Sequence, residues 1–264
     1  MEIKQIRLEK NGFYTIVFTE GQEVQVSEDL LVKYRLLKGS EITAELFETL
    51  KASAGYQIGL QMAYNYVSYQ LRSEKEMYQY LKKKEVTTKD AKEIIARLKE
   101  LNLVDDQVYA ESYIRTQIRM GDKGPYVLSQ NLKQKGIDPL IIEQALYLYT
   151  IDDQQAIAIK VAEKSWRKNQ NKSYQENLQK IRATLMQKGF GSEVIQLALD
   201  ELSFEKDEEA EENALFIEGA KLLRRHQRLD RSKRIQKIKN QLYQKGFSLD
   251  QIQHFIDEEV IEDE

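Results

Sequence analysis

The side chains of this chain that could carry out chemistry are few, and their spacing fits no catalytic or metal site. His226 and His254 are the two histidines, and neither belongs to a His-x-x-x-His or Glu-x-x-His pattern, in which one helix face presents two ligands to a metal ion. The chain has no cysteine, which excludes a thiolate metal site and a disulfide scaffold. We therefore expect both histidines to be surface or helix-face residues, and we expect no metal and no cofactor.

The acidic and glycine-containing motifs are equally unlike an active site. Three pairs of carboxylates are adjacent in sequence, at 105–106, 152–153 and 258–259, and neighbouring side chains point to different faces of a helix. Their simpler role is to place negative charge at a helix N-terminus. The glycines of 121–125 lack the spacing and the Lys-Ser/Thr pair of a phosphate-binding loop. The sequence therefore predicts a protein that is not an enzyme.

Basic residues are the stronger candidates for a binding function. Residues 205–264 carry 11 basic and 15 acidic residues, yet 221–239 alone holds nine lysines and arginines. Such segregation differs from an evenly charged helix surface and suits an anionic partner, although a solvated helix face would also explain it. The candidate contact residues in this segment are Arg224, Arg225, Arg228, Arg231, Lys233 and Lys237.

A second basic group accompanies a concentration of tyrosines near residues 64–80. Five tyrosines occur there, and they can either pack between helices or stack on nucleic-acid bases beside basic neighbours. If the cluster in 221–239 is only a solvated face, we expect the contact site to lie elsewhere, at Arg72, Lys82, Lys83, Arg115, Arg119 and Lys123.

The elements that must position these side chains repeat along the chain. Two apolar residues four apart, a lysine three residues later, and an apolar pair ten and eleven residues beyond it occur four times. The lysines are Lys84, Lys135, Lys188 and Lys245, with separations of 51, 53 and 57 residues. Because apolar residues four apart share a helix face, each copy predicts a helix, a turn and a second helix. A period of about fifty residues is typical of a helical array.

In three copies a glycine follows the lysine, at Gly136, Gly189 and Gly246. Glycine at this position favours the left-handed conformation that ends many helices. We therefore expect positive φ at all three, and a loss of about 1 kcal/mol when alanine replaces any of them. The first copy has Glu85 instead, and we expect its turn to be built differently, through Thr87-Thr88.

A further helix precedes each pair, so each unit is a three-helix module. The apolar spacing places these leading helices at 61–71, 106–119, 153–166 and 208–225. For the helix after each turn, the N-cap candidates are Asp138, Ser192, Ser248 and Asp250.

The first 55 residues differ from the array, because they are rich in strand-forming residues. Asn11-Gly12 and Glu20-Gly21 are typical of tight hairpin turns. Ser27 can cap a short helix that runs through Leu37, and a second short helix is expected at 42–54. The chain is thus predicted to be mainly α, with tandem three-helix repeats in an elongated curved array and a small β-rich N-terminal element. The expected domains are 1–58, 59–104, 105–151, 152–204 and 205–264.

Composition sets further limits on where the protein acts. No apolar run is long enough to span a membrane, and the charged start Met1-Glu2-Ile3-Lys4 does not resemble a signal peptide. We therefore expect a cytoplasmic protein without a membrane partner. We also expect a monomer.

Several of these motifs together resemble the RecX family of bacterial regulatory proteins. Asp105-Asp106-x-x-Tyr109-Ala110, Lys123-Gly124-Pro125 and Leu132-x-x-Lys135-Gly136-Ile137 resemble the family's central signature, and Arg72-Ser73-Glu74-x-Glu76 resembles its opening module. The similarity runs from about residue 60 to 250, and the N-terminal extension is similar to that of the longer Gram-positive members.

The resemblance implies a non-catalytic modulator of RecA, the recombinase that forms filaments on single-stranded DNA in recombination, DNA repair and the SOS response. It implies binding to RecA and RecA–DNA filaments, with inhibition of ATPase and strand exchange, and single-stranded DNA as a further partner. The alternative from the residues is a helical repeat protein that binds single-stranded or duplex DNA independently of RecA.

Overall fold

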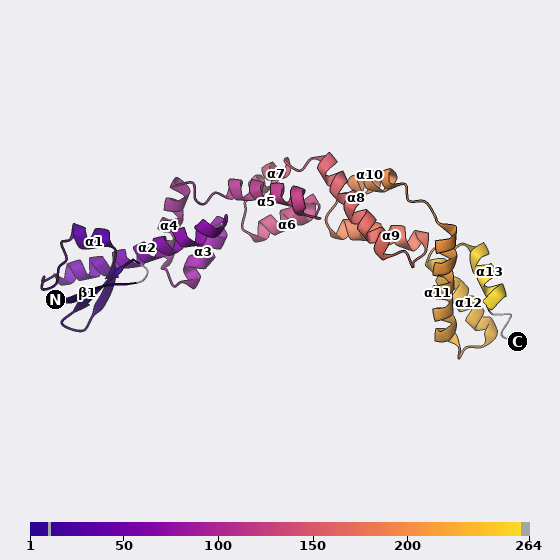
Figure 1. Cartoon of the computed structure of the whole chain (residues 1–264), viewed down its shortest axis with the longest axis horizontal. Helices are drawn as coiled ribbons and strands as arrows, with labels where there is room; N and C mark the ends of the chain where they lie inside the picture. Colours follow the sequence, from indigo (N-terminus) through magenta and orange to yellow (C-terminus); the bar gives the residue numbers. More distant parts are fainter. Residues whose placement is uncertain (10–11, 260–264) are drawn as a thin grey trace. The chain divides into compact units, whose positions relative to one another are not determined.

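The computed structural model describes residues 1–9 and 12–259. Asn11, expected in the first hairpin turn, and residues 260–264 of the acidic tail lie outside the described residues. The described part consists of a three-stranded sheet followed by thirteen helices (Figure 1). Contacts divide it into two compact units, Met1–Ser112 with Leu132–Ile142, and Tyr113–Asn131 with Glu143–Glu264. The expected mainly helical class with a small β element is confirmed.

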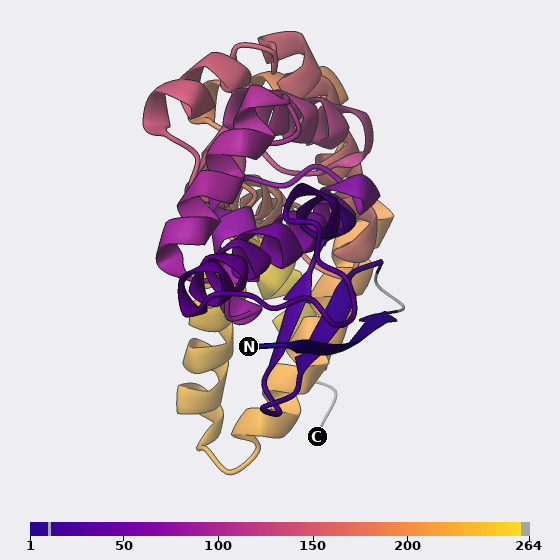
Figure 2. The same ribbon diagram turned by 90° about the vertical axis from the view of Figure 1, so that its left-hand side faces the viewer.

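The N-terminal sheet is an antiparallel meander of β1 (Ile3–Leu8), β2 (Tyr14–Phe18) and β3 (Glu23–Val26), with β2 in the middle (Figure 2). Gly21 has φ +87°, as the expected turn between β2 and β3 requires. Ile3, Ile16 and Val26 are fully buried, because alternate residues of a strand share one face. This face forms a core with the first helices.

The first helix, α1 (Glu28–Lys33), begins as expected but ends early. Ser27 Oγ accepts a hydrogen bond from the Leu30 N–H at 3.4 Å. The predicted end at Leu37 is wrong, because the chain leaves the helix at Tyr34 and Arg35 takes positive φ (+48°).

The long helix α2 (Ala44–Tyr69) replaces the two separate helices expected at 42–54 and 61–71. Its first half carries Leu50 and Ala54 into the core of the sheet, and its second half carries Ala63 into the core of α3 and α4. One helix therefore serves two cores, so the expected domain border at 58/59 lies inside an element. Gly59 permits the close approach of α4, since a Cβ there would lie 2.8 Å from Ile94 Cδ1.

Helices α2 to α13 form four consecutive groups of three. We call α2–α4 module 1, α5–α7 module 2, α8–α10 module 3 and α11–α13 module 4. Their bounds are α3 (Glu74–Lys83), α4 (Thr88–Glu100), α5 (Asp106–Met120), α6 (Pro125–Gln134), α7 (Pro139–Leu146), α8 (Ile151–Lys168), α9 (Tyr174–Gln187), α10 (Ser192–Leu202), α11 (Glu208–His226), α12 (Arg231–Gln244) and α13 (Leu249–Glu259).

The repeated apolar residues form the centre of each module, as the periodicity predicts. Both members of the pair before each lysine are fully buried: Met77 and Leu81, Leu128 and Leu132, Ile181 and Leu185, Ile238 and Leu242. The residue ten positions after the lysine is buried in every copy: Ile94, Ala145, Ala198 and Phe255.

The expected N-caps are confirmed at two of the four positions. Asp138 Oδ1 accepts from the Leu140 N–H at 2.8 Å, and Ser248 Oγ accepts from the Gln251 N–H at 3.2 Å. The prediction for Ser192 is wrong, because Gly191 already has the extended backbone of an N-cap (φ −74°, ψ 157°). Asp250 lies inside α13, whose cap is supplied by Ser248.

The turn after each lysine is left-handed in all four copies. Gly136, Gly189 and Gly246 have φ of +85°, +89° and +93°, which confirms the expectation. The expectation of a different turn in the first copy is wrong, since Glu85 takes φ +62° in the same place and Thr87 instead caps α4. Glu85 is exposed, so its side chain fits without a clash.

The first two modules are joined through the lysine turn of module 2. Ser73 Oγ, at the N-cap of α3, donates to the Lys135 carbonyl at 2.8 Å, and Lys135 Nζ lies 2.6 Å from Glu76 Oε1. Asp106, in the first turn of α5, accepts from the Glu74 N–H at 2.9 Å. The free N–H groups at the start of α3 are thus bonded partly by the next module.

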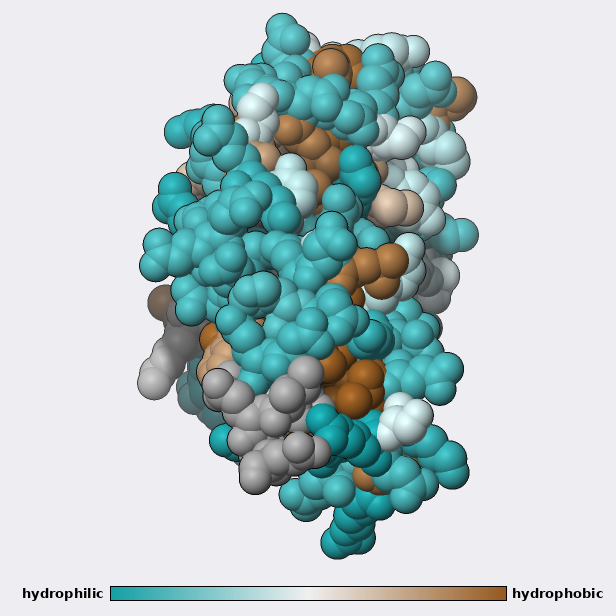
Figure 3. Space-filling view, turned by 90° about the vertical axis from the view of Figure 1, so that its right-hand side faces the viewer, coloured by the Kyte–Doolittle hydropathy of each residue, from teal (hydrophilic) through white to brown (hydrophobic). Residues whose placement is uncertain are grey.

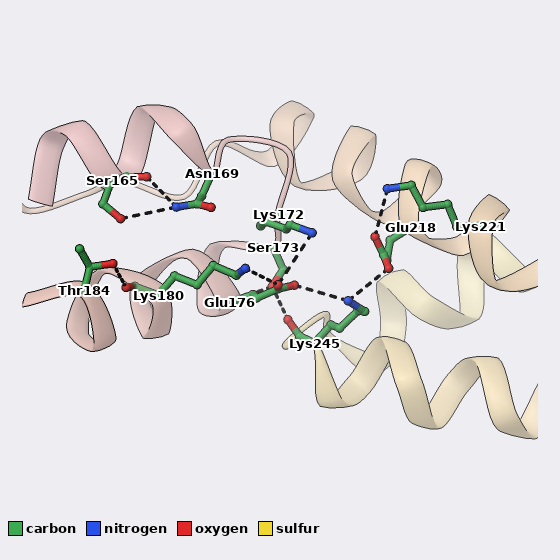
Figure 4. A network of polar contacts seen from close by, with 10 residues as sticks. All are labelled: Ser165, Asn169, Lys172, Ser173, Glu176, Lys180, Thr184, Glu218, Lys221 and Lys245. Atoms are coloured by element: carbon green, nitrogen blue, oxygen red, sulfur yellow. Dashed lines mark hydrogen bonds and ion pairs between the residues drawn. The ribbon is translucent and has the colours of Figure 1, made fainter. Parts of the chain in front are cut away.

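Modules 3 and 4 are joined in the same way (Figure 4). Ser173 Oγ, at the N-cap of α9, donates to the Lys245 carbonyl. Lys245 Nζ lies 3.2 Å from a Glu218 oxygen and 3.8 Å from a Glu176 oxygen. Glu211 in α11 accepts from the N–H of Tyr174 at 2.7 Å, as Asp106 does from Glu74.

Modules 2 and 3 use a variant of this junction. The Gly124 N–H donates to the Lys188 carbonyl at 2.8 Å, the Tyr126 N–H donates to Gly189 at 3.2 Å, and Lys188 pairs with Asp122. Residue 125 is proline, which has no N–H. This junction therefore needs no carboxylate in the place that Asp106 and Glu211 occupy in the other two.

The turn glycines allow these junctions to close. A Cβ on Gly189 would lie 2.6 Å from Val127 N, one on Gly246 would lie 2.5 Å from Gln175 Cβ, and one on Gly136 would lie 2.6 Å from Lys75 Cδ. Each contact comes from the module before the glycine. Glycine is therefore required both for its positive φ and for its missing side chain.

Candidate functional site

The basic cluster of module 4 lies at the end of α11 and the start of α12. The six candidate residues in it, Arg224, Arg225, Arg228, Arg231, Lys233 and Lys237, are all exposed. Lys233 Nζ lies 3.6 Å from an Asp230 oxygen, a pair in which both side chains are largely exposed. Such a pair contributes little to stability. The structure places these exposed cations on one helical hairpin, and their role as a contact site stays a prediction.

The two histidines occupy different environments. His254 pairs with Glu258 at 3.2 Å on the surface of α13, as expected. His226 is buried instead, and its Nε2 lies 3.1 Å from Gln241 Oε1, which links α11 to α12. Within the described residues, no group of three His, Asp or Glu side chains is placed to hold a metal ion.

The candidates in module 1 separate into a packed residue and two exposed ones. The guanidinium carbon of Arg72 lies 4.0 Å from the ring centroid of Tyr66, and Tyr66 stacks on Tyr80 with centroids 4.0 Å apart and planes 4° apart. Both faces of Tyr66 are therefore covered, which favours packing over base stacking for this pair. Lys82 and Lys83, in the last turn of α3, are exposed.

The remaining candidates lie on and after α5. Arg115 and Arg119 are exposed on this helix. Lys123 is half-buried, and its carbonyl accepts a hydrogen bond from the Tyr149 hydroxyl at 3.1 Å. Burial raises the pKa of Tyr149, so the phenol stays protonated as this bond requires. The part that Lys123 demonstrably plays is thus to hold its own loop through its backbone.

The pKa values of the carboxylates at the junctions shift in opposite directions. Burial works to raise the pKa of Glu76, but hydrogen bonds from the Lys135 side chain and the Ser73 N–H lower it below the ordinary value. Burial likewise works to raise the pKa of Glu218, but the hydrogen bond and the charge of Lys245 lower it. Burial raises the pKa of Glu211, and the hydrogen bond from the Tyr174 N–H lowers it by less. The pKa is therefore lowered at the two junction carboxylates that a lysine side chain contacts, and raised at the one that accepts from a backbone N–H.

A cationic groove between α8 and α9 was missed by the sequence reasoning. Its volume is about 610 Å³, and five lysines line it: Lys160, Lys164, Lys168, Lys180 and Lys188. Three of them occur four residues apart on α8, so they share one helix face. That spacing was visible in the sequence, but the lysines that face them come from α9.

The surface drawn in Figure 3 is mainly hydrophilic, and its hydrophobic areas form small separate patches. None of the described helices combines the length and the apolar character that crossing a membrane requires. Hydrophilic residues rather than a broad apolar face therefore dominate this surface.

Family models match all four modules. The first RecX three-helix domain matches residues 60–98, the second matches 105–146, and the third matches twice, at 152–199 and 209–256. The chain is 50% identical over 260 residues to the regulatory protein RecX of Enterococcus faecalis, which covers 98% of both chains. The chain belongs to the RecX family.

Solved RecX structures support the same conclusion. A crystal structure of a regulatory protein RecX has 32% identity and a TM-score of 0.63, covering 75% of this chain and 98% of the other. RecX from Lactobacillus salivarius has 39% identity and a TM-score of 0.54, covering 57% and 98%. The first of these structures carries the name of a regulatory protein.

Proposed function

We propose that this RecX-family chain is a non-catalytic regulator that binds RecA and RecA–DNA filaments and inhibits RecA ATPase and strand exchange. The observation that carries the proposal is the 50% identity to a regulatory protein RecX along nearly the whole chain. The repeated junctions support it, because tandem modules linked by a recurring lysine turn are typical of repeat proteins, which commonly act by binding partners.

The test measures RecA-dependent ATP hydrolysis on single-stranded DNA as this protein is added. We expect ATPase and strand exchange to fall at a protein concentration well below that of RecA, since one bound chain would restrain several RecA subunits. If neither activity changes at any ratio up to equimolar, the proposal is wrong.

A second candidate is direct DNA binding without RecA, and the exposed basic cluster of module 4 favours it. The two differ in their salt dependence, because a phosphate binder loses affinity for naked strands steeply as salt rises. A filament regulator would instead bind RecA-coated DNA far better than naked DNA at the same salt concentration.

The module 4 cluster is tested with the variant R224E/R225E/R228E. We expect weaker binding to RecA-coated DNA with unchanged helicity by circular dichroism, since all three side chains are exposed. The control is K38E/K51E/K89E, which makes the same charge change at three exposed lysines of unit 1. Equal binding by the two variants would mean that the cluster is only a solvated face.

A further inference from the structure

The groove between α8 and α9 has an unusual charge composition. Five lysines line it, and Asp122 is the one carboxylate among its lining residues. Asp122 is engaged by Lys188, which lowers the pKa of this carboxyl through their hydrogen bond. The groove is therefore strongly positive even after this pair is formed.

Three of the lysines form no ion pair with a described carboxylate, although the charge of Lys164 helps to lower the pKa of Asp122. Lys180 lies 3.4 Å from Glu176, whereas no carboxylate in the described residues lies within ion-pair distance of Lys160, Lys164 or Lys168. All three are exposed on one face of α8. Like charges four residues apart destabilise a helix. A row of lysines that weakens its own helix and forms no ion pair among the described residues is suited to an external polyanion.

The other lining groups restrict what the polyanion can be. The lining includes the buried side chains of Ile157 and Val161, the amide of Gln187, and the amide of Asn169, whose Nδ2 donates to the Ser165 carbonyl. Lysine, asparagine and glutamine are typical donors to phosphate and sugar oxygens. No aromatic side chain lines the groove, so it offers no platform on which bases could stack.

We propose that this lysine groove binds the sugar–phosphate backbone of a nucleic-acid strand without reading its bases. Neighbouring lysines in the α8 row of three are about 6 Å apart along the helix axis. They therefore form a linear row of cations that suits a linear row of phosphates. An acidic protein surface would require an array of carboxylates that matches the spacing of these lysines. The site goes beyond the proposed regulation of RecA, because it acts on the strand itself.

The experiment uses the full chain without RecA and a fluorescent oligo-dT strand. In the variant K160E/K164E/K168E we expect roughly tenfold or greater loss of affinity at low salt. The slope of log Kobs against log salt should also become shallower by about 2, since each phosphate contact on a single strand contributes about 0.7. Oligo-dA should bind as well as oligo-dT, because the groove contacts the sugar–phosphate backbone and not the bases.

Matched controls distinguish the groove from a general effect of added negative charge. K38E/K51E/K89E makes the same charge change elsewhere, and should keep the wild-type salt slope. K160Q/K164Q/K168Q should show the same change of slope without introducing acidic repulsion, with helicity checked by circular dichroism. A groove variant that binds like the control overturns the proposal. The proposal is also overturned if poly-L-glutamate displaces the labelled strand as well as unlabelled oligo-dT does, because the groove would then accept an acidic polypeptide. RecA ATPase is measured in a separate assay, so a failure of the proposed RecA regulation can be distinguished from a failure of the groove proposal.

Discussion

Replacing Gly189 by alanine tests whether the turn glycines act through the backbone alone or also through the junction. Gly189 has φ +89°, which costs an L-residue about 1–2 kcal/mol. Alanine also restricts the unfolded chain, which offsets about 0.4–1 kcal/mol of this loss in the free energy of unfolding. On these terms alone, the variant would lose about 1 kcal/mol, as the sequence predicts.

The structure adds a steric contribution to that loss. The new Cβ would lie 2.6 Å from Val127 N, and a backbone atom cannot move aside as a side-chain end can. Forcing an extra carbon into such a contact costs about 1–3 kcal/mol. We therefore expect a total loss of about 2–4 kcal/mol, with the bonds from Gly124 and Tyr126 to the Lys188-Gly189 turn weakened together.

Native-state hydrogen exchange is the suitable assay, because it reports opening free energies locally. Amides at 124, 126–128 and 185–190 should lose protection in G189A, while Pro125 has no amide hydrogen. The control is G21A, where φ is +87° but nothing lies within 4 Å of the new Cβ. It should lose only about 1 kcal/mol, confined to the hairpin. If G189A loses no more than G21A, the close contact between modules 2 and 3 plays no energetic role and the reasoning fails.

The other predictions concern the junction charges. K245M should lower the free energy of unfolding in urea by about 1 kcal/mol, because Lys245 is partly buried against two carboxylates, whereas K233M should leave it unchanged; equal effects would contradict this. The lowered pKa of Glu76 stabilises the fold above its unfolded value near 4.5, and this stabilisation is lost as pH falls through the folded pKa. E76Q should therefore flatten the acid side of the stability profile. The raised pKa of Glu211 has the opposite sign, so E211Q should relieve a loss of stability that sets in as pH rises above 4.5. Identical pH profiles for the two variants would refute the assignment.

Local patterns predicted the repeat accurately. The buried pairs such as Ile181 and Leu185 follow from helical spacing, and the positive φ of Gly189 follows from its place after a helix end. Glu85 shows the limit of that reasoning, since a non-glycine residue takes the same turn where no preceding three-helix module packs against it. The single helix α2 also escaped prediction, because its apolar residues face two different cores in succession.

The candidate site was predictable only in part, for a physical reason. The cluster in 221–239 is contiguous in sequence, so composition alone brought its cations together. The lysine groove lies between α8 and α9. Its charge depends on residues of both helices, so it is known only when the two helices are placed against each other.

The sequence by itself determined the module: helix spacing, turns and caps are set by residues within a few positions of one another. Only the tertiary structure decided what joins the modules. Lys135 and Lys245 appear in the sequence as helix-end lysines, and the fold makes each a bridge to the capped helix of the preceding module. Ser73 and Lys135 lie 62 residues apart, so no local pattern could pair them. Their contact depends on how one folded module packs against the next.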